Sequence, residues 1–214
     1  MTGGKPTGLI GGAFDPVHTG HIRIALVCAE SLNLEKVIFI PANVAPHKTE
    51  AGAAPKHRLA MLERALKPYP QLAVDDVELR RGGISYTIDT LIELRAGNPE
   101  QSLCFIMGAD AFTTLPTWRR WQELTDYAHL VIIDRKQQGE RRWDQRLQDH
   151  YAGHACASPL NLHTRPGGCI HKAAVTVPDI SSSQARALLN GKQDTENILP
   201  PGIHDYIKEN NLYS

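Results

Sequence analysis

The sequence has no excess of either charge, because its 214 residues include 23 basic and 23 acidic side chains. A balanced chain has no general attraction to nucleic acid or to a lipid surface, so any anion-binding site must be local. No apolar run approaches the ~18 residues that cross a membrane, and the first residues lack the apolar core of a signal peptide. These absences predict a soluble cytoplasmic protein without a nucleic-acid or membrane partner. The length suits a single domain over residues 1–214.

Cysteine is scarce as well, and no two cysteines form a Cys-x-x-Cys pair. Cys28 and Cys104 fall within apolar runs, where a thiol behaves as a small hydrophobic side chain. We therefore expect buried free thiols rather than metal ligands or disulfides among the four cysteines, which are Cys28, Cys104, Cys156 and Cys169. No side chains are predicted to hold a metal.

The two common nucleotide-binding loops, Gly-x-Gly-x-x-Gly and Gly-x-x-x-x-Gly-Lys-Ser/Thr, are also absent. A different glycine-rich stretch, residues 11–21, lies between an apolar run at residues 8–10 and a helical pattern at residues 22–34. Glycine lets the backbone approach a ligand closely, and a helix N-terminus presents N–H groups to an anion. The pattern predicts a phosphate site at the carboxyl end of a buried strand.

Strand and helix patterns alternate along the rest of the chain, which predicts an α/β fold with a doubly wound parallel sheet. Residues 137–166 have the least regular pattern. Ser85 or Thr87 is expected to cap the helix that ends at Gly97. The expected strands are residues 8–10, 35–41, 72–79, 102–107, 129–133 and 170–177. The other expected helices are residues 55–67, 140–150, one ending near 191, and 201–212, with a broken helical stretch at 111–124.

Two motifs carry a family resemblance. The first is Gly-Gly-Ala-Phe-Asp-Pro at residues 11–16 followed by His18-Thr19-Gly20-His21, and the second is Ile-Ser-Ser-Ser-Gln-Ala-Arg at residues 180–186. Both resemble the bacterial nicotinate-nucleotide adenylyltransferases, of the His-x-Gly-His nucleotidyltransferase superfamily. The chain departs from that pattern at Ala13, where the family often has Ser or Thr, and at Ser183, where Thr is commoner. The resemblance implies a Rossmann-like fold.

The residues themselves allow two interpretations of each motif. His18 and His21 are three apart at a helix start, so both can face one phosphate, or one can cap the helix while the other is buried in the core. Arg186 follows Ser182 and Ser183 on one helix face, where hydroxyls, N–H groups and a guanidinium suit a β,γ-phosphate site. The alternative is an ordinary N-cap cluster of serines.

The resemblance also implies residue roles. Without the resemblance, Lys48 would be interpreted as a solvated loop lysine and Asp110 as a helix cap. The resemblance places Trp118 under the pyridine ring of the second substrate, nicotinate mononucleotide. We interpret Trp121 as a residue of the hydrophobic core. The implied catalytic residues are His18, His21, Lys48 and Arg186. The implied ATP-binding residues are Gly11, Gly12, Ala13, Phe14, His18, His21, Gly108, Asp110, Ile180, Ser182, Ser183 and Arg186. The implied residues for the second substrate are Asp15, Lys48, Ser85, Tyr86, Thr87 and Trp118.

The reaction that the resemblance implies is transfer of AMP from ATP to nicotinate mononucleotide, giving deamido-NAD and pyrophosphate. The motifs contain no nucleophile beside a base, so no covalent intermediate is expected. Mg²⁺ would be bound mainly through the ATP phosphates. The alternatives are a nicotinamide mononucleotide or phosphopantetheine adenylyltransferase and, from another class, a non-catalytic nucleotide sensor. A homo-oligomer stays open.

Overall fold

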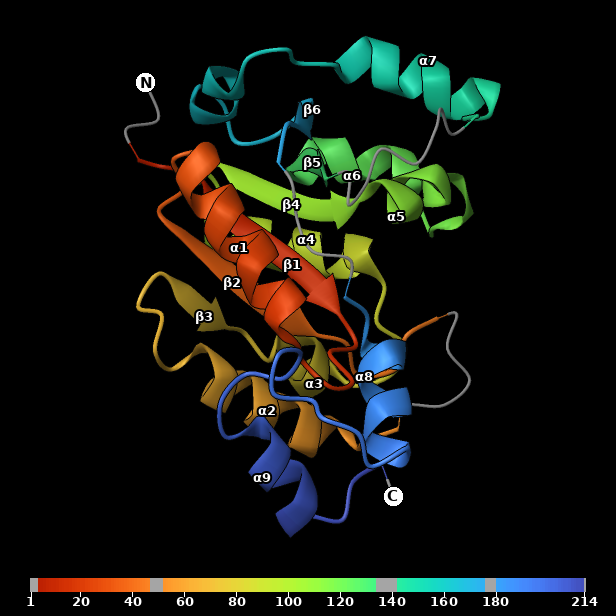
Figure 1. The fold of residues 1–214 in the computed structure, drawn as a ribbon. Coiled ribbons are helices and arrows are strands. Elements are labelled where there is room, and N and C mark those ends of the chain that lie inside the picture. Colours follow the sequence, from red (N-terminus) through yellow and green to blue (C-terminus); the bar gives the residue numbers. More distant parts are fainter. Residues whose placement is uncertain (1–3, 47–51, 134–141, 176–179, 214) are drawn as a thin grey trace.

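The computed structural model describes residues 4–46, 52–133, 142–175 and 180–213. Its strands form one parallel sheet in the order β3-β2-β1-β4-β5-β6, which confirms the doubly wound arrangement. The chain first builds outward from β1 to β3 and then returns to add β4, β5 and β6 on the other side (Figure 1). The strands are β1 (Thr7–Gly12), β2 (Lys36–Pro41), β3 (Leu72–Val74), β4 (Leu103–Gly108), β5 (His129–Ile133) and β6 (Ile170–Ala173).

Two hydrophobic clusters cover the two faces of the sheet. Successive strand residues alternate between them, so that Ile10 joins the cluster under the first helices whereas Leu9 joins the other. The helices of the first face are α1 (Thr19–Ser31), α2 (Pro55–Leu66), α8 (Ser182–Asn190) and α9 (Ile203–Glu209). Those of the second face are α3 (Val77–Arg81), α4 (Thr87–Gly97), α5 (Ala109–Thr113), α6 (Leu124–Tyr127) and α7 (Gln145–His154). Short 3₁₀ turns span Leu115–Thr117, Trp121–Glu123 and Pro159–His163.

The predicted strand over residues 72–79 is wrong in its second half. The strand ends at Val74, and Val77–Arg81 is helical. Asp75 accepts the N–H of Val77 at 3.0 Å, and Asp76 pairs with Arg80 one turn later at 2.6 Å. These two carboxylates favour a helix start over a continued strand.

Several predicted bounds also differ. The first helix begins at Thr19 rather than residue 22, and the last helix spans only Ile203–Glu209. The N-cap of α4 is Tyr86, so the prediction of a Ser85 or Thr87 cap is wrong. Ser85 instead accepts the backbone N–H of Asn43 at 2.9 Å. Residues 140–141 of the predicted helix and 176–177 of the predicted last strand lie outside the described ranges.

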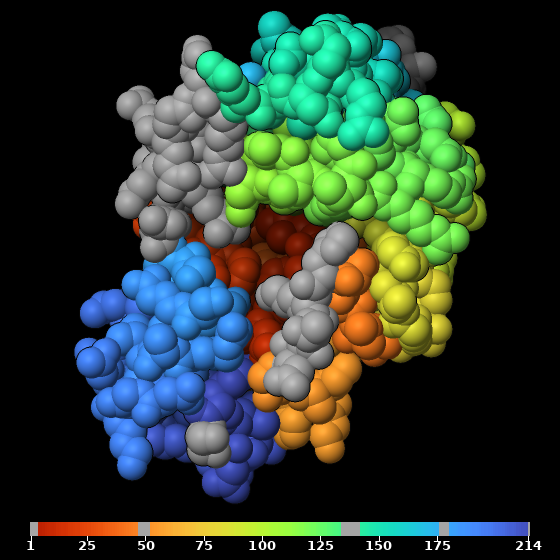
Figure 2. All heavy atoms as spheres, turned by 90° about the vertical axis from the view of Figure 1, so that its right-hand side faces the viewer, coloured from red at the N-terminus to blue at the C-terminus, as the bar shows by residue number. Residues whose placement is uncertain are grey.

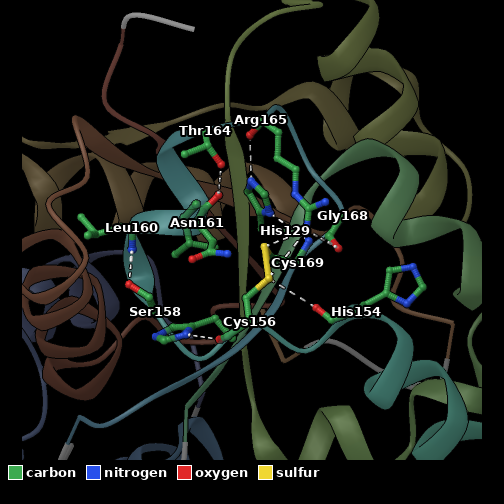
Figure 3. The surroundings of a disulfide bond; sticks show 12 residues. His129, His154, Cys156, Ser158, Leu160, Asn161, Thr164, Arg165, Gly168 and Cys169 are labelled. Carbon is green, nitrogen blue, oxygen red and sulfur yellow. Dashed lines mark hydrogen bonds between the residues drawn. A yellow bond between two sulfur atoms is a disulfide. The ribbon is translucent and has the colours of Figure 1, made fainter. Parts of the chain in front are cut away.

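The cysteine prediction holds for one pair and is wrong for the other. Cys28 and Cys104 are buried free thiols, and burial raises the pKa of each to about 12. Cys156 and Cys169 form a disulfide, shown in Figure 3. Ala155, directly after α7, pairs with Ile170 at the start of β6, and this pairing brings the two cysteines together. The spacing of the cysteines in the sequence does not predict this contact.

Candidate active site

A cleft lies at the carboxyl ends of β1 and β4, where the order of the strands reverses. Its volume is about 680 Å³, within the range of small-molecule sites. In an open α/β sheet the reversal of strand order creates a crevice outside the strand ends. Figure 2 shows this hollow, with residues of the amino-terminal segment (red) on its floor and α8 (blue) beside it.

The glycine-rich segment forms one wall of the cleft through Gly11, Gly12 and Ala13. His18 is the N-cap of α1 and is buried, whereas His21 lines the cleft. Their rings stack with centroids 3.5 Å apart. Gly20 permits close packing here, because a Cβ at this position would lie 3.0 Å from the His18 ring, tighter than an ordinary van der Waals contact. The helix-cap interpretation therefore fits His18, and the ligand-facing interpretation fits His21.

A hydrogen bond determines which nitrogen of His21 can donate. The backbone N–H of His18 donates to Nδ1 of His21 at 3.2 Å. In a neutral imidazole, a nitrogen that accepts leaves the hydrogen on the other nitrogen, here Nε2. Phe14 supports the His21 ring: it is buried, packs edge-on against His21 and contacts Phe39 at a tilted angle. The Phe14 side chain supports the site without lining the cleft.

The second motif packs against the first through residues that are more than 160 positions apart in the chain. Ser182 donates to the carbonyl of Pro16 at 3.0 Å, and Arg186 donates to the carbonyl of Asp15 at 2.5 Å. Arg186 also donates to Ser183 at 3.2 Å, while Ser181 caps α8. Ile180 lies against Gly20. These α8 residues adjoin the glycine-rich segment but do not line the 680 Å³ cleft itself.

Asp15 has its carboxylate inside the protein. It accepts N–H bonds from Gly52 at 2.6 Å and Ala53 at 3.0 Å, and the hydroxyl of Tyr213 donates to it at 2.6 Å. Burial and this neighbouring carboxylate raise the pKa of Tyr213. The structure thus gives Asp15 protein partners and does not bring its side chain into the cleft. Lys48 lies outside the described residues.

Arg58 holds together segments of the chain around the cleft, and the sequence analysis did not identify it. Its guanidinium is buried and donates to the carbonyls of Ala13 at 2.7 Å, Asn43 at 3.0 Å and Ala53 at 3.2 Å. Burial lowers its pKa. It thereby joins three segments around the cleft. An arginine on the inward face of an amphipathic helix, beside Leu62, was the available signal.

The start of α4 and a tryptophan form another part of the cleft wall. Ser85, Tyr86, Thr87 and Trp118 all line it. Thr87 is the first residue of α4, where backbone N–H groups have no intrahelical acceptor. Trp118 is half-buried and packs edge-on against Phe105. Trp121 is buried in the second core, which confirms its predicted packing role.

Comparison with known proteins decides the family. The cytidylyltransferase-like family matches residues 9–188. A probable nicotinate-nucleotide adenylyltransferase of Aeromonas salmonicida is 40% identical over 208 residues, which are 97% of each chain. A probable nicotinate-nucleotide adenylyltransferase of Hahella chejuensis is 39% identical over 217 residues, covering 98% of this chain and 96% of that one. The chain belongs to the nicotinate-nucleotide adenylyltransferase family.

Solved structures support the same fold. The Plasmodium falciparum nicotinic acid mononucleotide adenylyltransferase complexed with NaAD superposes with a TM-score of 0.73 at 19% identity, over 98% of this chain and 97% of that chain. A putative nicotinate-nucleotide adenylyltransferase from Vibrio parahaemolyticus gives a TM-score of 0.63 at 15% identity, over 98% and 95%. A nicotinate-nucleotide adenylyltransferase is a nucleotidyltransferase, so the substrates of this protein are nucleotides.

Among the residues that the structure describes, three acidic or basic side chains line the cleft besides His21. Asp110 lies in the first turn of α5, whose N-cap is Gly108, so Asp110 is not the cap. Glu78 is buried and accepts a hydrogen bond from Thr90 at 2.6 Å. Arg119 is the third. The sequence analysis named only Asp110, because Glu78 lay in a predicted strand and Arg119 beside a more conspicuous tryptophan.

No cluster of three His, Cys, Asp or Glu side chains that could hold a metal occurs within residues 4–46, 52–133, 142–175 and 180–213. In the same ranges, no helix is long and apolar enough to cross a membrane.

Proposed function

We propose that this chain transfers AMP from ATP to nicotinate mononucleotide, releasing pyrophosphate and forming deamido-NAD, and that residues 1–214 act as one nucleotidyltransferase domain. The observation that carries the proposal is the single cleft that joins His21 and the glycine-rich segment to the start of α4 and Trp118. Such a cleft can hold a triphosphate nucleotide at one end and a pyridine at the other. We expect the reaction in the cytoplasm, because ATP is its substrate.

The ATP end is assigned to the two motifs. The backbone of Gly11, Gly12 and Ala13 would receive the α-phosphate, since residues without large side chains permit close approach. Asp110, on the rim of the cleft near Gly108, would accept hydrogen bonds from the ribose hydroxyls. The β- and γ-phosphates would extend toward the α8 N-terminus, where the residues that receive them are Ile180, Ser182, Ser183 and Arg186.

The chemical step needs no general base. A phosphate monoester has its second pKa near ~6 and is largely dianionic at neutral pH. An oxygen of the mononucleotide phosphate attacks the α-phosphorus, the bond from that phosphorus to the bridging oxygen breaks, and pyrophosphate leaves with the electron pair. Catalysis then consists of positioning and charge stabilisation. His21 would donate from Nε2 to the α-phosphate, and buried His18 would hold that ring in place.

The pyridine end is assigned to Trp118 and α4. The flat face of Trp118 offers a stacking surface, while the backbone N–H groups of Tyr86 and Thr87 suit the carboxylate of the nicotinate ring. Ser85 shapes this corner by binding the segment after β2, through its bonds to Asn43 and Val44. Lys48 is assigned to the phosphates of both substrates on the resemblance alone.

Mg²⁺ fits this site as a partner of ATP. The described residues offer isolated carboxylates and no preformed ligand cage, which suits a small cation that keeps waters and binds phosphate oxygens. The ion, when bound, would neutralise charge on the triphosphate. Asp110 is the carboxylate that we assign to the ATP end of the cleft, whereas Arg186 would neutralise negative charge on the β- and γ-phosphates.

The deciding experiment measures pyrophosphate release from ATP with nicotinate mononucleotide, nicotinamide mononucleotide or phosphopantetheine as acceptor. We expect release with nicotinate mononucleotide and none with phosphopantetheine. Release with nicotinamide mononucleotide alone would change the substrate. ATP binding without release from any acceptor would identify a nucleotide sensor instead.

A further inference from the structure

In the part of the chain that the structure describes, the side chains that line the cleft include a carboxylate, Glu78, and a guanidinium, Arg119. Glu78 and Arg119 line the cleft together with Tyr86 and Trp118. Glu78 is only 7% exposed, and one of its carboxylate oxygens accepts the hydroxyl of Thr90. A buried carboxylate repels a second carboxylate nearby. A substrate bearing a ring carboxylate therefore needs a compensating cation here, whereas its carboxamide analogue does not.

Arg119 is placed over the first turn of α4. Its Cζ atom lies 4.8 Å from the centroid of the Tyr86 ring, and its Nη1 atom lies 3.6 Å from Oδ2 of Asp89. The distance to Asp89 is longer than a hydrogen bond, so this pair leaves guanidinium N–H groups able to donate to a ligand. Arg119 is thus a cation at the cleft wall, beside the residues assigned to the ring carboxylate.

We propose that the Arg119 side chain makes the enzyme prefer a pyridine mononucleotide with a carboxylate over one with a carboxamide. The inference rests on the proposed function and adds a specificity residue to it. A guanidinium presents paired N–H donors that match the two oxygens of a carboxylate. A carboxamide has one oxygen and no charge, so it gains less from the same contact. Asp89 competes for Arg119 and therefore weakens the preference.

The neighbouring Arg120 supplies a matched control. It pairs with Glu123 at 2.6 Å and does not line the cleft. It has the same charge and lies at the adjacent position, so long-range electrostatic effects of losing one cation are nearly the same for both arginines. Of these two arginines, only Arg119 lines the cleft and can contact the carboxylate of the pyridine ring.

The experiment measures kcat/KM for nicotinate and nicotinamide mononucleotides at saturating ATP. Arg119→Gln should lower the acid-to-amide ratio about 10- to 150-fold, mainly through the KM of the acid, which is the effect of one charge-assisted hydrogen bond. Arg119→Lys should keep part of the preference. Arg120→Gln should leave the ratio unchanged. Asp89→Asn should raise the ratio about 2- to 5-fold, because it frees Arg119 and removes a like charge.

The direction of the Asp89 effect distinguishes specificity from damage, since a merely misfolded corner would not favour the acid. An unchanged ratio in Arg119→Gln, or an equal loss with both mononucleotides, would overturn the inference. If the unaltered enzyme releases no pyrophosphate with nicotinate mononucleotide, the proposed function fails instead. Thermal unfolding of each variant confirms that the proteins compared are folded.

Discussion

Arginines lie at both ends of the parallel strands, which we call the amino edge and the carboxyl edge of the sheet, but their surroundings differ. At the amino edge, Arg95 donates to backbone carbonyls that include those of Tyr127, Gln101 and Pro166. At the carboxyl edge, Arg119 lines a cleft and Arg186 adjoins the glycine-rich segment. An arginine whose donors all meet carbonyls of its own chain fixes loops, whereas one beside a cleft can receive an anion.

Two histidines make the comparison sharper. His129, at the amino edge, accepts the N–H of Cys169 through Nδ1 at 3.0 Å and donates from Nε2 to the carbonyl of Arg165 at 2.9 Å. His21 likewise accepts a backbone N–H through Nδ1, but its ring lines the cleft. The same tautomer results in both places. The two histidines differ in their surroundings: Nε2 of His129 donates to a backbone carbonyl, whereas the His21 ring lines the cleft, where we propose that its Nε2 donates to a substrate phosphate.

The largest effect should come from His21→Ala. We expect turnover to fall by roughly 10²–10³-fold with a much smaller loss of ATP affinity, because a donor that strengthens as charge develops acts on the rate. Steady-state kinetics and ATP binding measure the two separately. His163→Ala, whose ring contacts the carbonyl of Leu32 away from the cleft, is the control and should keep normal turnover. Normal turnover in folded His21→Ala would remove this residue from the mechanism.

His129 should dominate the acid sensitivity of the fold. Burial lowers its pKa from 6.5 to about 4, so the unfolded chain binds a proton between these values that the folded chain does not. The resulting stability is complete above pH 6.5 and is lost as the pH falls toward 4, at most about 3 kcal/mol. Burial also lowers the pKa of His150, which adds in the same direction. Unfolding from pH 7 to 4 should depend less on pH in His129→Gln, and an unaltered slope would contradict this assignment.

The two tryptophans should separate binding from packing. Trp118→Ala should raise the KM for nicotinate mononucleotide by several-fold or more and leave the KM for ATP nearly unchanged, since ring stacking contributes about 1–3 kcal/mol. Trp121→Ala should instead lower the melting temperature, because the ring is buried in the second core. The reverse result would mean that the roles of the two rings are exchanged.

The smallest effect is expected from Arg186→Lys. Lysine keeps the charge and loses the planar pair of donors, so the KM for ATP should rise a few-fold while that for the mononucleotide changes little. Arg80→Lys, in the surface ion pair with Asp76, is the matched control. Equal ATP kinetics in both variants would make Arg186 a structural partner of Asp15 only.

The carboxyl edge was largely predictable, because its signals are local. The glycines of residues 11–20 and the apolar strands before them mark a strand–loop–helix turn within a few residues. Contacts that depend on the return of distant chain were not predictable, such as the Cys156–Cys169 disulfide and the three carbonyls that Arg58 joins. Glu78 reached the cleft only because a short helix replaced the expected strand.

The bonds that converge on Asp15 also set an order of assembly. During synthesis the amino-terminal segments emerge first, and contacts between distant residues form slowly. Asp15 leaves the ribosome long before Arg186 and Tyr213, which later meet its carbonyl and its carboxylate. Until then the glycine-rich segment lacks these two contacts with the carboxyl-terminal part of the chain, whereas Gly52 and Ala53, the other donors to the Asp15 carboxylate, emerge much earlier. The contacts of Asp15 with Arg186 and Tyr213 can therefore form only after all six strands of the sheet have been synthesised.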